Sequence, residues 1–450
     1  MSQERRITAS RLGRLSQLGR LAGGIAGGVI VESARQAAHG KLPSVGDVLM
    51  TPANARRLGE RLSEMRGAAM KVGQLLSMDS GHLLPPALSD LLSGLREDAH
   101  PMPLGQVAEV LKQAWGSGWE TGFRRFSFTP LAAASIGQVH RAELKDGRCL
   151  AVKIQYPDIQ RSIDSDVDNV ATLLRLSGLV PAGMDIGALL EEAKAQLHAE
   201  ADYRREARAL TRFASRLADD PRFEVPAVIG EWSTRRVLSM RYLGGKPIES
   251  LEDAPRDRRN AAASALLELA LREVFEWGLV QTDPNFANYL YDSDTGRIQL
   301  LDFGATGDYG EEEREALHEL LGACVTGDDD ALTAAAIAVG YLDTDDPAGY
   351  RDSVIALLRT ATEPARVPGV FDFARSDLAQ RMRDIVLAIR LQERYARIPP
   401  PRILFLHRKL GGLYLLLSRL RASVPVADRV RAALAGTTGA SPRLHRRQAG

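Results

Sequence analysis

The sequence predicts an α+β protein of two lobes, in which a small sheet-containing lobe precedes a mostly helical one and an all-helical extension precedes both. Three observations predict this arrangement. Residues 128–156 contain strand-like stretches on both sides of a small-residue loop. Residues 185–217 and 256–277 follow the periodicity of helices. Residues 289–301 indicate a β-hairpin with polar side chains at its ends.

The hairpin region carries the strongest chemical motif. Its strands are expected over residues 289–292 and 298–301. Asp283 lies five positions before Asn288, and the tripeptide Asp-Phe-Gly begins at Asp302, fourteen positions after that asparagine. In a protein-kinase-like centre, the first Asp orients the acceptor hydroxyl or water, while the Asn and the last Asp hold metal. Magnesium prefers such oxygen ligands. We therefore predict a protein-kinase-like fold with catalytic Asp283 and metal ligands Asn288 and Asp302.

Length and composition set wider limits. The 450 residues suffice for two or three domains, and a net charge of +1 gives no reason to expect nucleic acid as a partner. Two cysteines provide neither a disulfide framework nor a metal-ligand spacing. No apolar run reaches the roughly 18–20 residues that cross a bilayer; residues 404–417 are interrupted by a His-Arg-Lys triplet, so we expect a core helix there. The expected segments are an N-terminal extension (1–50), a helical extension (51–120), the first lobe (121–245), the second lobe (246–436) and a tail (437–450).

The N-terminal extension is basic. Residues 1–20 contain five arginines and one glutamate, with leucines at three-residue spacing, and an apolar stretch follows over residues 21–31. A basic amphipathic helix on an anionic membrane, a transit-like sequence and a flexible arm all fit this composition. The basic residues 443–447 are expected to belong to a disordered end.

The helical extension contains an apolar stripe that includes polar residues. A helix is expected from Thr51 to Met78, because Thr is a favoured N-cap and Pro52 follows it. A Lys and a Gln within the stripe are costly to bury without partners, so something should receive them. The alternative is a lysine that snorkels at the helix edge. A glycine in the stripe would permit the close approach of another backbone. The residues that share this face are Gly67, Lys71, Gln74, Leu75 and Met78.

The small-residue loop resembles a glycine-rich loop that is made mostly of alanine. In the pattern G-x-G-x-x-G-x-V, alanines occupy the first two glycine positions. Alanine disfavours positive φ and stiffens the loop. A small-residue hairpin without a ligand is the alternative. The expected nucleotide-binding residues of this loop are Ala132, Ala133, Ala134, Ser135, Gly137 and Val139.

Lys153 follows the loop in the sequence Ala-Val-Lys-Ile, as the ATP-contacting lysine does on the third strand of a kinase lobe. A kinase helix supplies one Glu to this lysine. Glu200 and Glu206 are six positions apart, which is about 240° around one helix. Both therefore cannot face Lys153; one should pair with it while the other serves a different partner, and the pattern does not decide which.

Two further segments shape the predicted site. Residues 223–229 and 236–242 alternate as strands, and residues 240–243, including Met240 and Tyr242, are expected to be the hinge whose backbone contacts the adenine. After the Asp-Phe-Gly motif, Glu311 already begins a new helix. This spacing leaves no room for the long activation segment on which ordinary protein kinases bind peptides, which argues against peptide phosphorylation.

Together these motifs resemble the UbiB (AarF/ADCK) family of atypical kinase-like proteins. The resemblance runs from about residue 55 to residue 420. The sequence QTDPNFANYLYD is closer to the mitochondrial ubiquinone-biosynthesis branch than to bacterial UbiB, where the loop more often has the sequence HADPHPGN; Gln281, Asn285 and Ala287 are the departures. The motifs that carry the resemblance are MKVGQLLS (70–77), AAASIGQVH (132–140), AVKIQYP (151–157) and EADYRREA (200–207).

The resemblance implies a kinase-like fold with a helical extension across the active site, binding of ATP and Mg²⁺, ATPase or unorthodox kinase activity, and support of ubiquinone biosynthesis at a membrane. It also implies that Lys71 and Gln74 reach toward the nucleotide and restrict the site. Bacterial UbiB has C-terminal transmembrane helices, and the sequence shows none here, so membrane attachment would have to come from the N-terminus or an amphipathic surface.

We therefore expect an atypical kinase or ATPase that uses Mg-ATP and supports quinone metabolism. The alternative is a nucleotide-gated module that binds or presents lipid intermediates with little turnover; a conventional protein kinase is disfavoured by the missing activation segment. The expected partners are a nucleotide, anionic membrane lipid, and quinone-pathway enzymes or lipid intermediates, without nucleic acid. The expected location is cytoplasmic, at the inner face of a membrane if a membrane is bound. The phosphoryl acceptor and the oligomeric state stay open.

Overall fold

The computed structural model describes residue 62 and residues 65–79, 101–176, 186–392 and 399–437. The expected helix start at Thr51 and the predictions for both chain ends lie outside these residues. The chain forms two compact units. The first unit extends to Arg216 and includes Pro226–Leu243; the second contains Leu217–Val225 and everything from Gly244 onward. The chain therefore passes between the units three times.

The first unit is built on an antiparallel sheet in the order β1-β2-β3-β5. The predicted strands are confirmed, and in the turn between β2 and β3 Gly147 adopts a positive φ of 88°, which favours glycine. The strands are β1 (Phe123–Ala133), β2 (Gly137–Leu144), β3 (Cys149–Gln155) and β5 (Val237–Arg241).

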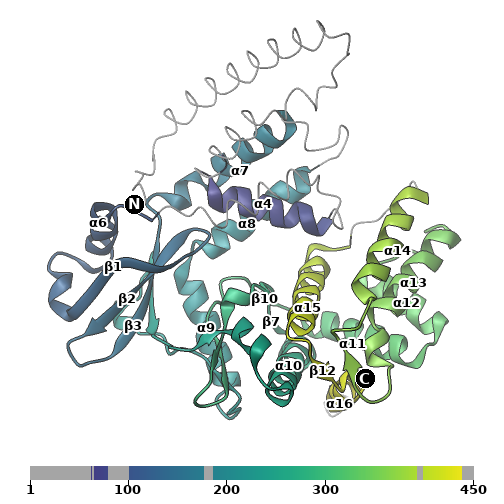
Figure 1. The fold of residues 1–450 in the computed structure, drawn as a ribbon. Coiled ribbons are helices and arrows are strands. Elements are labelled where there is room, and N and C mark those ends of the chain that lie inside the picture. Colours follow the sequence, from purple (N-terminus) through teal and green to yellow (C-terminus); the bar gives the residue numbers. More distant parts are fainter. Residues whose placement is uncertain (1–61, 63–64, 80–100, 177–185, 393–398, 438–450) are drawn as a thin grey trace, which may run out of the picture. The chain divides into compact units, whose positions relative to one another are not determined.

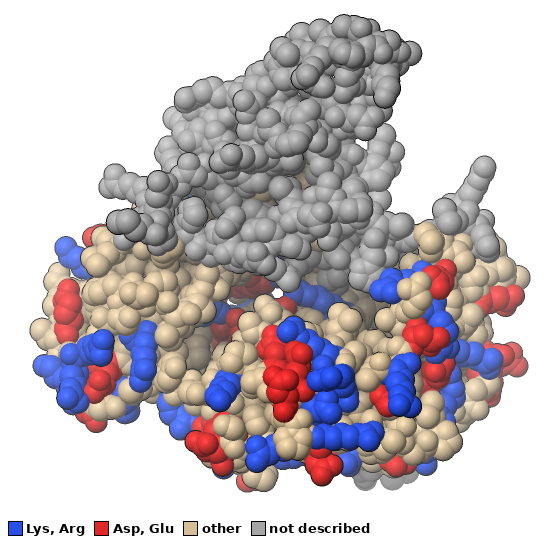
Figure 2. Space-filling model, in the orientation of Figure 1, with Lys and Arg blue, Asp and Glu red and all other residues tan. Residues whose placement is uncertain are grey.

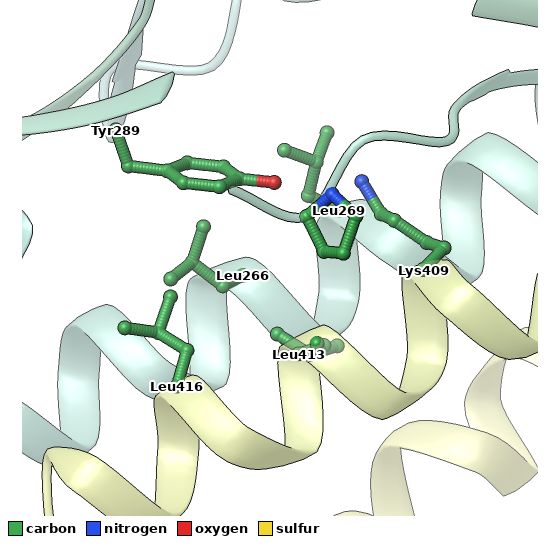
Figure 3. A pocket seen from close by; sticks show the side chains of 8 residues that line it. Leu266, Leu269, Tyr289, Lys409, Leu413 and Leu416 are labelled. Atoms are coloured by element: carbon green, nitrogen blue, oxygen red, sulfur yellow. The ribbon is translucent and has the colours of Figure 1, made fainter. Parts of the chain in front are cut away.

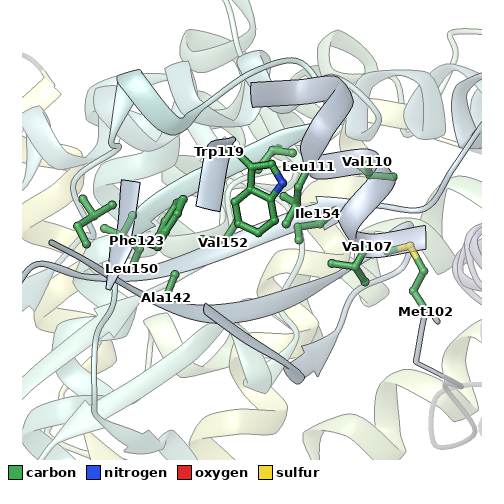
Figure 4. Close-up of a cluster of buried hydrophobic side chains, with 12 residues drawn as sticks. Met102, Val107, Val110, Leu111, Trp119, Phe123, Ala142, Leu150, Val152 and Ile154 are labelled. Atoms are coloured by element: carbon green, nitrogen blue, oxygen red, sulfur yellow. The ribbon is translucent and has the colours of Figure 1, made fainter. Parts of the chain in front are cut away.

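One face of this sheet is covered by α6 (Leu104–Trp115) and the 3₁₀ turn η1 (Trp119–Gly122). Apolar side chains of α6 and the strands form one buried cluster (Figure 4). Trp115 packs at its edge, with its ring centroid 5.1 Å from that of Trp232 and 5.3 Å from that of Phe123. Burial of these apolar surfaces stabilises the sheet that carries Lys153.

The predicted helix over residues 185–217 is wrong, because the structure has two helices there, α8 (Gly187–Glu200) and α9 (Tyr203–Arg216). The carbonyl of Ala201 accepts hydrogen bonds from the side chains of Gln155 and Gln160, at 2.7 and 2.6 Å. Asp202 then caps the next helix by accepting from the Arg204 N–H at 3.1 Å. The Gln155 and Gln160 side chains thus bind the backbone where α8 ends, and the Asp202 side chain caps the start of α9.

Three helices pack together in the first unit. The first described helix of the extension is α4 (Arg66–Asp79), and it packs against α7 (Ile159–Leu176) and α8 (Figure 1). Its buried residues include Ala68, Ala69 and Val72. Lys71 and Leu75 of the predicted apolar stripe are buried as well.

The second unit contains the predicted hairpin, which is confirmed as β8 (Tyr289–Asp292) and β9 (Arg297–Leu300). The predicted strand over residues 223–229 is wrong in extent: only β4 (Phe223–Glu224) forms, and it pairs in parallel with β9. The sheet order is β4-β9-β8-β6, with β6 at Lys246–Pro247. A two-stranded ladder joins β7 (Leu279–Gln281) to β10 (Thr306–Asp308).

The helix predicted over residues 256–277 is present as α10 (Arg256–Leu271), which continues into a π-helical turn, η4 (Arg272–Trp277). The helix predicted to begin at Glu311 does so. The remaining elements are the helices α11 (Glu311–Thr326), α12 (Asp329–Val339), α13 (Ala348–Ala361), α14 (Leu378–Gln392), α15 (Pro401–Arg419) and α16 (Val426–Thr437), the 3₁₀ turns η2 (Gly230–Trp232), η3 (Ile248–Asp253), η5 (Phe286–Asn288) and η6 (Glu363–Ala365), and the paired strands β11 (Phe371–Asp372) and β12 (Ser423–Val424).

A sheet-containing first unit and a mostly helical second unit confirm the predicted α+β class. Among the described residues, no helix combines the length and the apolar character needed to cross a bilayer. The face in Figure 2 shows acidic and basic side chains intermixed. Charged side chains of the described residues form ion pairs, such as Arg222 with Glu268 at 2.5 Å and with Asp220 at 2.9 Å.

Candidate phosphoryl-transfer site

Lys153 and Glu206 form a buried ion pair in the first unit. The Lys153 Nζ atom on β3 lies 2.8 and 2.9 Å from the two carboxylate oxygens of Glu206 on α9. The side chains are only 9% and 2% exposed, so water screens the pair weakly. The Tyr203 ring centroid lies 5.3 Å from the same Nζ atom. The structure thus answers the question that the sequence left open: Glu206 is the partner of Lys153.

Glu200 serves the other lysine. Lys71 of α4 forms an ion pair with Glu200, the last residue of α8, and both side chains are largely buried. Ser135 Oγ of the alanine-rich loop donates to the second Glu200 oxygen at 3.3 Å. The lysine therefore has the buried partner that its place in an apolar stripe required, and the snorkelling alternative is wrong. Gln74 lies in α4, and its side chain is outside the described part of the chain.

Close backbone packing brings α4 to the alanine-rich loop. A Cβ atom added at Gly67 would lie 3.0 Å from the Ser135 carbonyl oxygen, so the predicted close approach is confirmed. The loop itself is tight, with the Ala134 N–H donating to the Gly137 carbonyl at 2.8 Å. At Gly137, a Cβ atom would lie 2.2 Å from the Ile154 carbonyl oxygen, which only glycine avoids.

The rest of the predicted nucleotide-binding set lies on β1, β2 and the end of β5. Ala132 pairs with Val139, and Ala133 pairs with Gln138, in the β1–β2 ladder. On β5, Met240 pairs with Ala151 of β3. The Tyr242 N–H donates to the Cys149 carbonyl oxygen at 2.9 Å, so a nucleotide base could use that donor only after this bond is broken. The boundary between the two units follows directly, at Leu243 and Gly244.

In the second unit, the hairpin brings the predicted metal ligands to one end. Tyr289 pairs with Leu300, and the Leu301 N–H donates to the Asn288 carbonyl oxygen at 3.0 Å. Asn288 and Asp302 therefore lie just before β8 and just after β9. The Asp302 Oδ1 atom accepts from the Gly304 N–H at 2.8 Å, which orders the Asp-Phe-Gly turn.

Asn288 also orients Asp283. Its Nδ2 atom donates to the Asp283 carbonyl oxygen and to Asp283 Oδ2, both at 3.2 Å. Because Nδ2 is used in these bonds, the Asn288 Oδ1 atom is the amide atom with which the predicted metal ligand could bind a metal. Within the described residues, no group of three or more His, Cys, Asp or Glu side chains could hold a metal by itself. One amide oxygen and one carboxylate suit Mg²⁺, which binds few protein ligands and shares its other positions with phosphate oxygens and water.

Gln281, which departs from the family pattern, links the two loops. Its Nε2 atom donates to the Asp283 carbonyl at 2.6 Å and to the Asp302 carbonyl at 3.3 Å. The side chain is buried, and its Oε1 atom has no hydrogen-bond partner among the residues that the structure describes. Its place at the end of β7, paired with Thr306 of β10, fixes this geometry.

A buried ion pair lies beneath these loops. Lys409 Nζ of α15 is 2.9 Å from Glu273 Oε2, and this same carboxylate oxygen accepts from the Gln281 N–H at 3.0 Å. Burial raises the pKa of Glu273, and the Lys409 ammonium opposes that shift. Burial likewise raises the pKa of Tyr289, whose hydroxyl is hydrogen-bonded to Lys409.

Figure 3 shows Tyr289 and Lys409 at a small recess whose other walls are mostly leucine side chains of α10 and α15. A volume of about 10 Å³ leaves room for no more than one water molecule. The recess is therefore packing space under the candidate site rather than a ligand pocket.

Arg408, the residue before Lys409, reaches Asp283 itself. Its Nη2 atom forms an ion pair with Asp283 Oδ1, and the two side chains are 14% and 26% exposed. Glu273, Arg408 and Lys409 were not predicted from the sequence. The available signal was the His-Arg-Lys triplet inside the apolar run of residues 404–417, because buried charges require partners.

Comparison with known proteins identifies the family. Residues 94–336 match the ABC1 atypical kinase-like domain. The chain belongs to this family. It is 38% identical to the mitochondrial atypical kinase COQ8B of Rattus norvegicus over 429 residues, covering 95% of this chain and 81% of that protein. It is 37% identical to the mitochondrial atypical kinase COQ8 of Saccharomyces cerevisiae over 424 residues, covering 94% and 84%.

A solved structure, the complex of Rv3197 with erythromycin from Mycobacterium tuberculosis, shares the fold of this ABC1 chain with a TM-score of 0.60 and 28% identity, covering 86% of this chain and 97% of that one. These relatives confirm the predicted family and its COQ8 branch, as well as the kinase-like fold. The kinase-like domain implies nucleotide binding.

Proposed function

We propose that this ABC1-family protein is an atypical kinase or ATPase that uses Mg-ATP and supports ubiquinone biosynthesis at a membrane surface. The observation that carries the proposal is the buried Lys153–Glu206 pair, together with Asp283, Asn288 and Asp302 at the base of one hairpin. Kinase catalysis needs both the lysine–glutamate pair and the metal-binding Asp in place.

Each residue has a role in this proposal. Lys153 positions the nucleotide phosphates, with Glu206 fixing the direction of its ammonium group. Asn288 and Asp302 hold Mg²⁺, which neutralises phosphate charge when bound. Asp283 orients the attacking hydroxyl or water. Lys71 holds α4 against Glu200 and the alanine-rich loop and so limits access to that loop.

The segment after Asp-Phe-Gly supports an acceptor other than a peptide. Residues 305–310 are all that separate Gly304 from α11, and three described residues of this stretch, 306–308, form β10. An acceptor in lipid metabolism, or water, suits this arrangement better than a peptide substrate. Anionic lipid and quinone-pathway proteins are proposed partners on the ground of the family alone, as is a peripheral place at the membrane; the rat and yeast relatives bear mitochondrial names.

The test is ATP hydrolysis by the purified protein with Mg²⁺, with and without anionic liposomes. Asp302→Asn should abolish Mg-dependent nucleotide binding, because it removes the carboxylate ligand, and Asp283→Asn should keep nucleotide binding but retain only a small residual turnover. Liposome-stimulated turnover that both variants largely lack supports the proposal. Unchanged Mg-nucleotide affinity in Asp302→Asn contradicts the metal assignment.

A second candidate function is a nucleotide-gated module that binds lipid intermediates with little turnover. The engagement of Asp283 by Arg408 and of Glu200 by Lys71 favours it, because both charged groups already have partners within the protein. Tight ATP binding without hydrolysis, with or without liposomes, would select this candidate.

A further inference from the structure

We propose that Arg408 is a positioning residue for phosphoryl transfer, through which α15 sets the orientation of Asp283. This inference rests on the proposed function, because it assigns a role within the same site. It concerns a residue from outside the hairpin and the Asp-Phe-Gly motif, 125 positions along the chain from the aspartate that it contacts.

The Asp283 carboxylate is held at both oxygens by different elements. Arg408 of α15 contacts Oδ1, and Asn288 donates to Oδ2 at 3.2 Å. With side chains 14% and 26% exposed, the Arg408–Asp283 pair is screened less than a surface pair. Two contacts from two directions leave the carboxylate one orientation, which is what an aspartate that orients an acceptor requires.

The catalytic loop brings no cation of its own. Residues 281–289, QTDPNFANY, contain no lysine or arginine. The positive charge beside Asp283 must therefore come from elsewhere, and α15 supplies it. Guanidinium is suited to this task because it is always charged and its donors lie in a fixed plane.

Contacts on the same helix preset the position of Arg408. Lys409 is bound to the buried Glu273. One turn later, Gly412 lies so close to Pro284 that an added Cβ atom would be 2.2 Å from the Pro284 Cβ. Pro284 directly follows Asp283, so α15 contacts the catalytic loop a second time one turn after Arg408. The helix is thus built to hold Arg408 at this aspartate.

The experiment compares Arg408→Ala and Arg408→Lys with Arg402→Ala as the matched control. Arg402 lies on the same helix, but it is 59% exposed and pairs with Glu313 at 2.6 Å. For each variant, kcat for ATP hydrolysis, the Kd for Mg-ATP and the thermal midpoint are measured with the full chain. Asp302→Asn is measured in parallel as a test of the site itself.

Arg408→Ala should lower kcat about 100-fold, the loss expected when a reacting group is misplaced by about 1 Å. The Kd for Mg-ATP should change by less than about threefold, since Arg408 does not bind the nucleotide in this proposal. Arg408→Lys should keep part of the rate, and Arg402→Ala all of it.

Millimolar methylguanidinium should restore turnover to Arg408→Ala, whereas urea should not. Combined with Asp283→Asn, the arginine substitution should cause no further loss, because the two residues act as a unit.

Different failures separate the two claims. No turnover by the wild-type protein under any condition overturns the proposed function and this inference with it. Turnover that depends on Asp302 but is unchanged in Arg408→Ala overturns this inference alone. A rate loss that methylguanidinium does not restore and that adds to the loss in Asp283→Asn shows a purely structural role. If Arg408→Ala does not fold, Arg408→Lys decides: a wild-type kcat in that variant contradicts the requirement for the guanidinium plane.

Discussion

Glu200 and Glu206 are separated by six positions, yet each holds a different lysine. Glu206 pairs with Lys153 of the sheet, and Glu200 pairs with Lys71 of the helical extension. Because α8 ends at Glu200 and α9 begins at Tyr203, the two glutamates are not bound by the separation of about 240° on a single continuous helix. At the scale of single residues, two largely buried carboxylates thus hold two lysine side chains at separate places in the first unit.

A buried pair also makes a prediction for the second unit. Lys409→Met should lower the free energy of unfolding by about 3–5 kcal/mol, because it leaves Glu273 buried without its counter-charge. Chemical denaturation measures this change. Lys409→Met combined with Glu273→Leu should recover much of the loss, since the uncompensated charge is then gone. A single substitution that costs less than about 1 kcal/mol would contradict this account, because that is the range of exposed ion pairs.

His140 predicts a dependence of stability on pH. Its Nδ1–H donates to the Ser127 carbonyl at 2.8 Å, and its Nε2 accepts from the Gln138 amide at 2.7 Å, so the ring is neutral. Burial lowers its pKa below the ordinary 6.5. Below about pH 6.5, the unfolded chain therefore binds more protons than the folded protein, and stability falls as pH falls toward the lowered pKa.

The measurement is the free energy of unfolding between about pH 7.5 and about pH 5.5, where an ordinary His titrates and this one resists protonation. The protein should lose stability over this range. His140→Gln should be less stable at the higher pH but should lose less stability on acidification, because it does not titrate. An equal loss in the variant would show that other groups cause the pH dependence.

At the scale of elements, the alanine-rich loop is braced from two sides. Gly67 of α4 brings a helix backbone against the Ser135 carbonyl, and Glu200 accepts from the Ser135 hydroxyl. The loop also closes on itself through the bond from the Ala134 N–H to Gly137. The non-glycine residues with positive φ in the described chain are Asp158 and Arg421, so the alanines take no strained conformation. A loop of this kind has little freedom to adapt to a ligand.

Ala134→Gly should therefore raise the affinity for nucleotide, because glycine restores access to positive φ and loosens the loop. Nucleotide titration by calorimetry measures the change, and Ala134→Ser, which keeps a Cβ atom, is the control. Equal affinities in the wild-type protein and the glycine variant would remove the argument that alanine stiffens the loop.

At the scale of the whole molecule, the elements that could be predicted from the sequence are those determined by residues close to one another in the chain. The strands around Lys153, the hairpin and the start of α11 follow from local periodicity and turn residues. The break at Ala201 did not, because side chains of Gln155 and Gln160 cause it from another part of the fold. The ion pairs of Arg408 and Lys409 could not be predicted for the same reason, because their partners lie more than a hundred positions away in the sequence and no spacing rule links them.

The threefold passage of the chain between its two units limits how the protein can be divided. A fragment that begins at Gly244 would lack β4, leaving β9 with an open edge and Gln299 without the Glu224 carboxylate that it contacts at 2.8 Å. A fragment that begins before Leu217 keeps that strand but carries residues 226–243, a strand of the other unit, without its sheet. No single cut in the gene therefore releases the second unit intact and free of residues from the first.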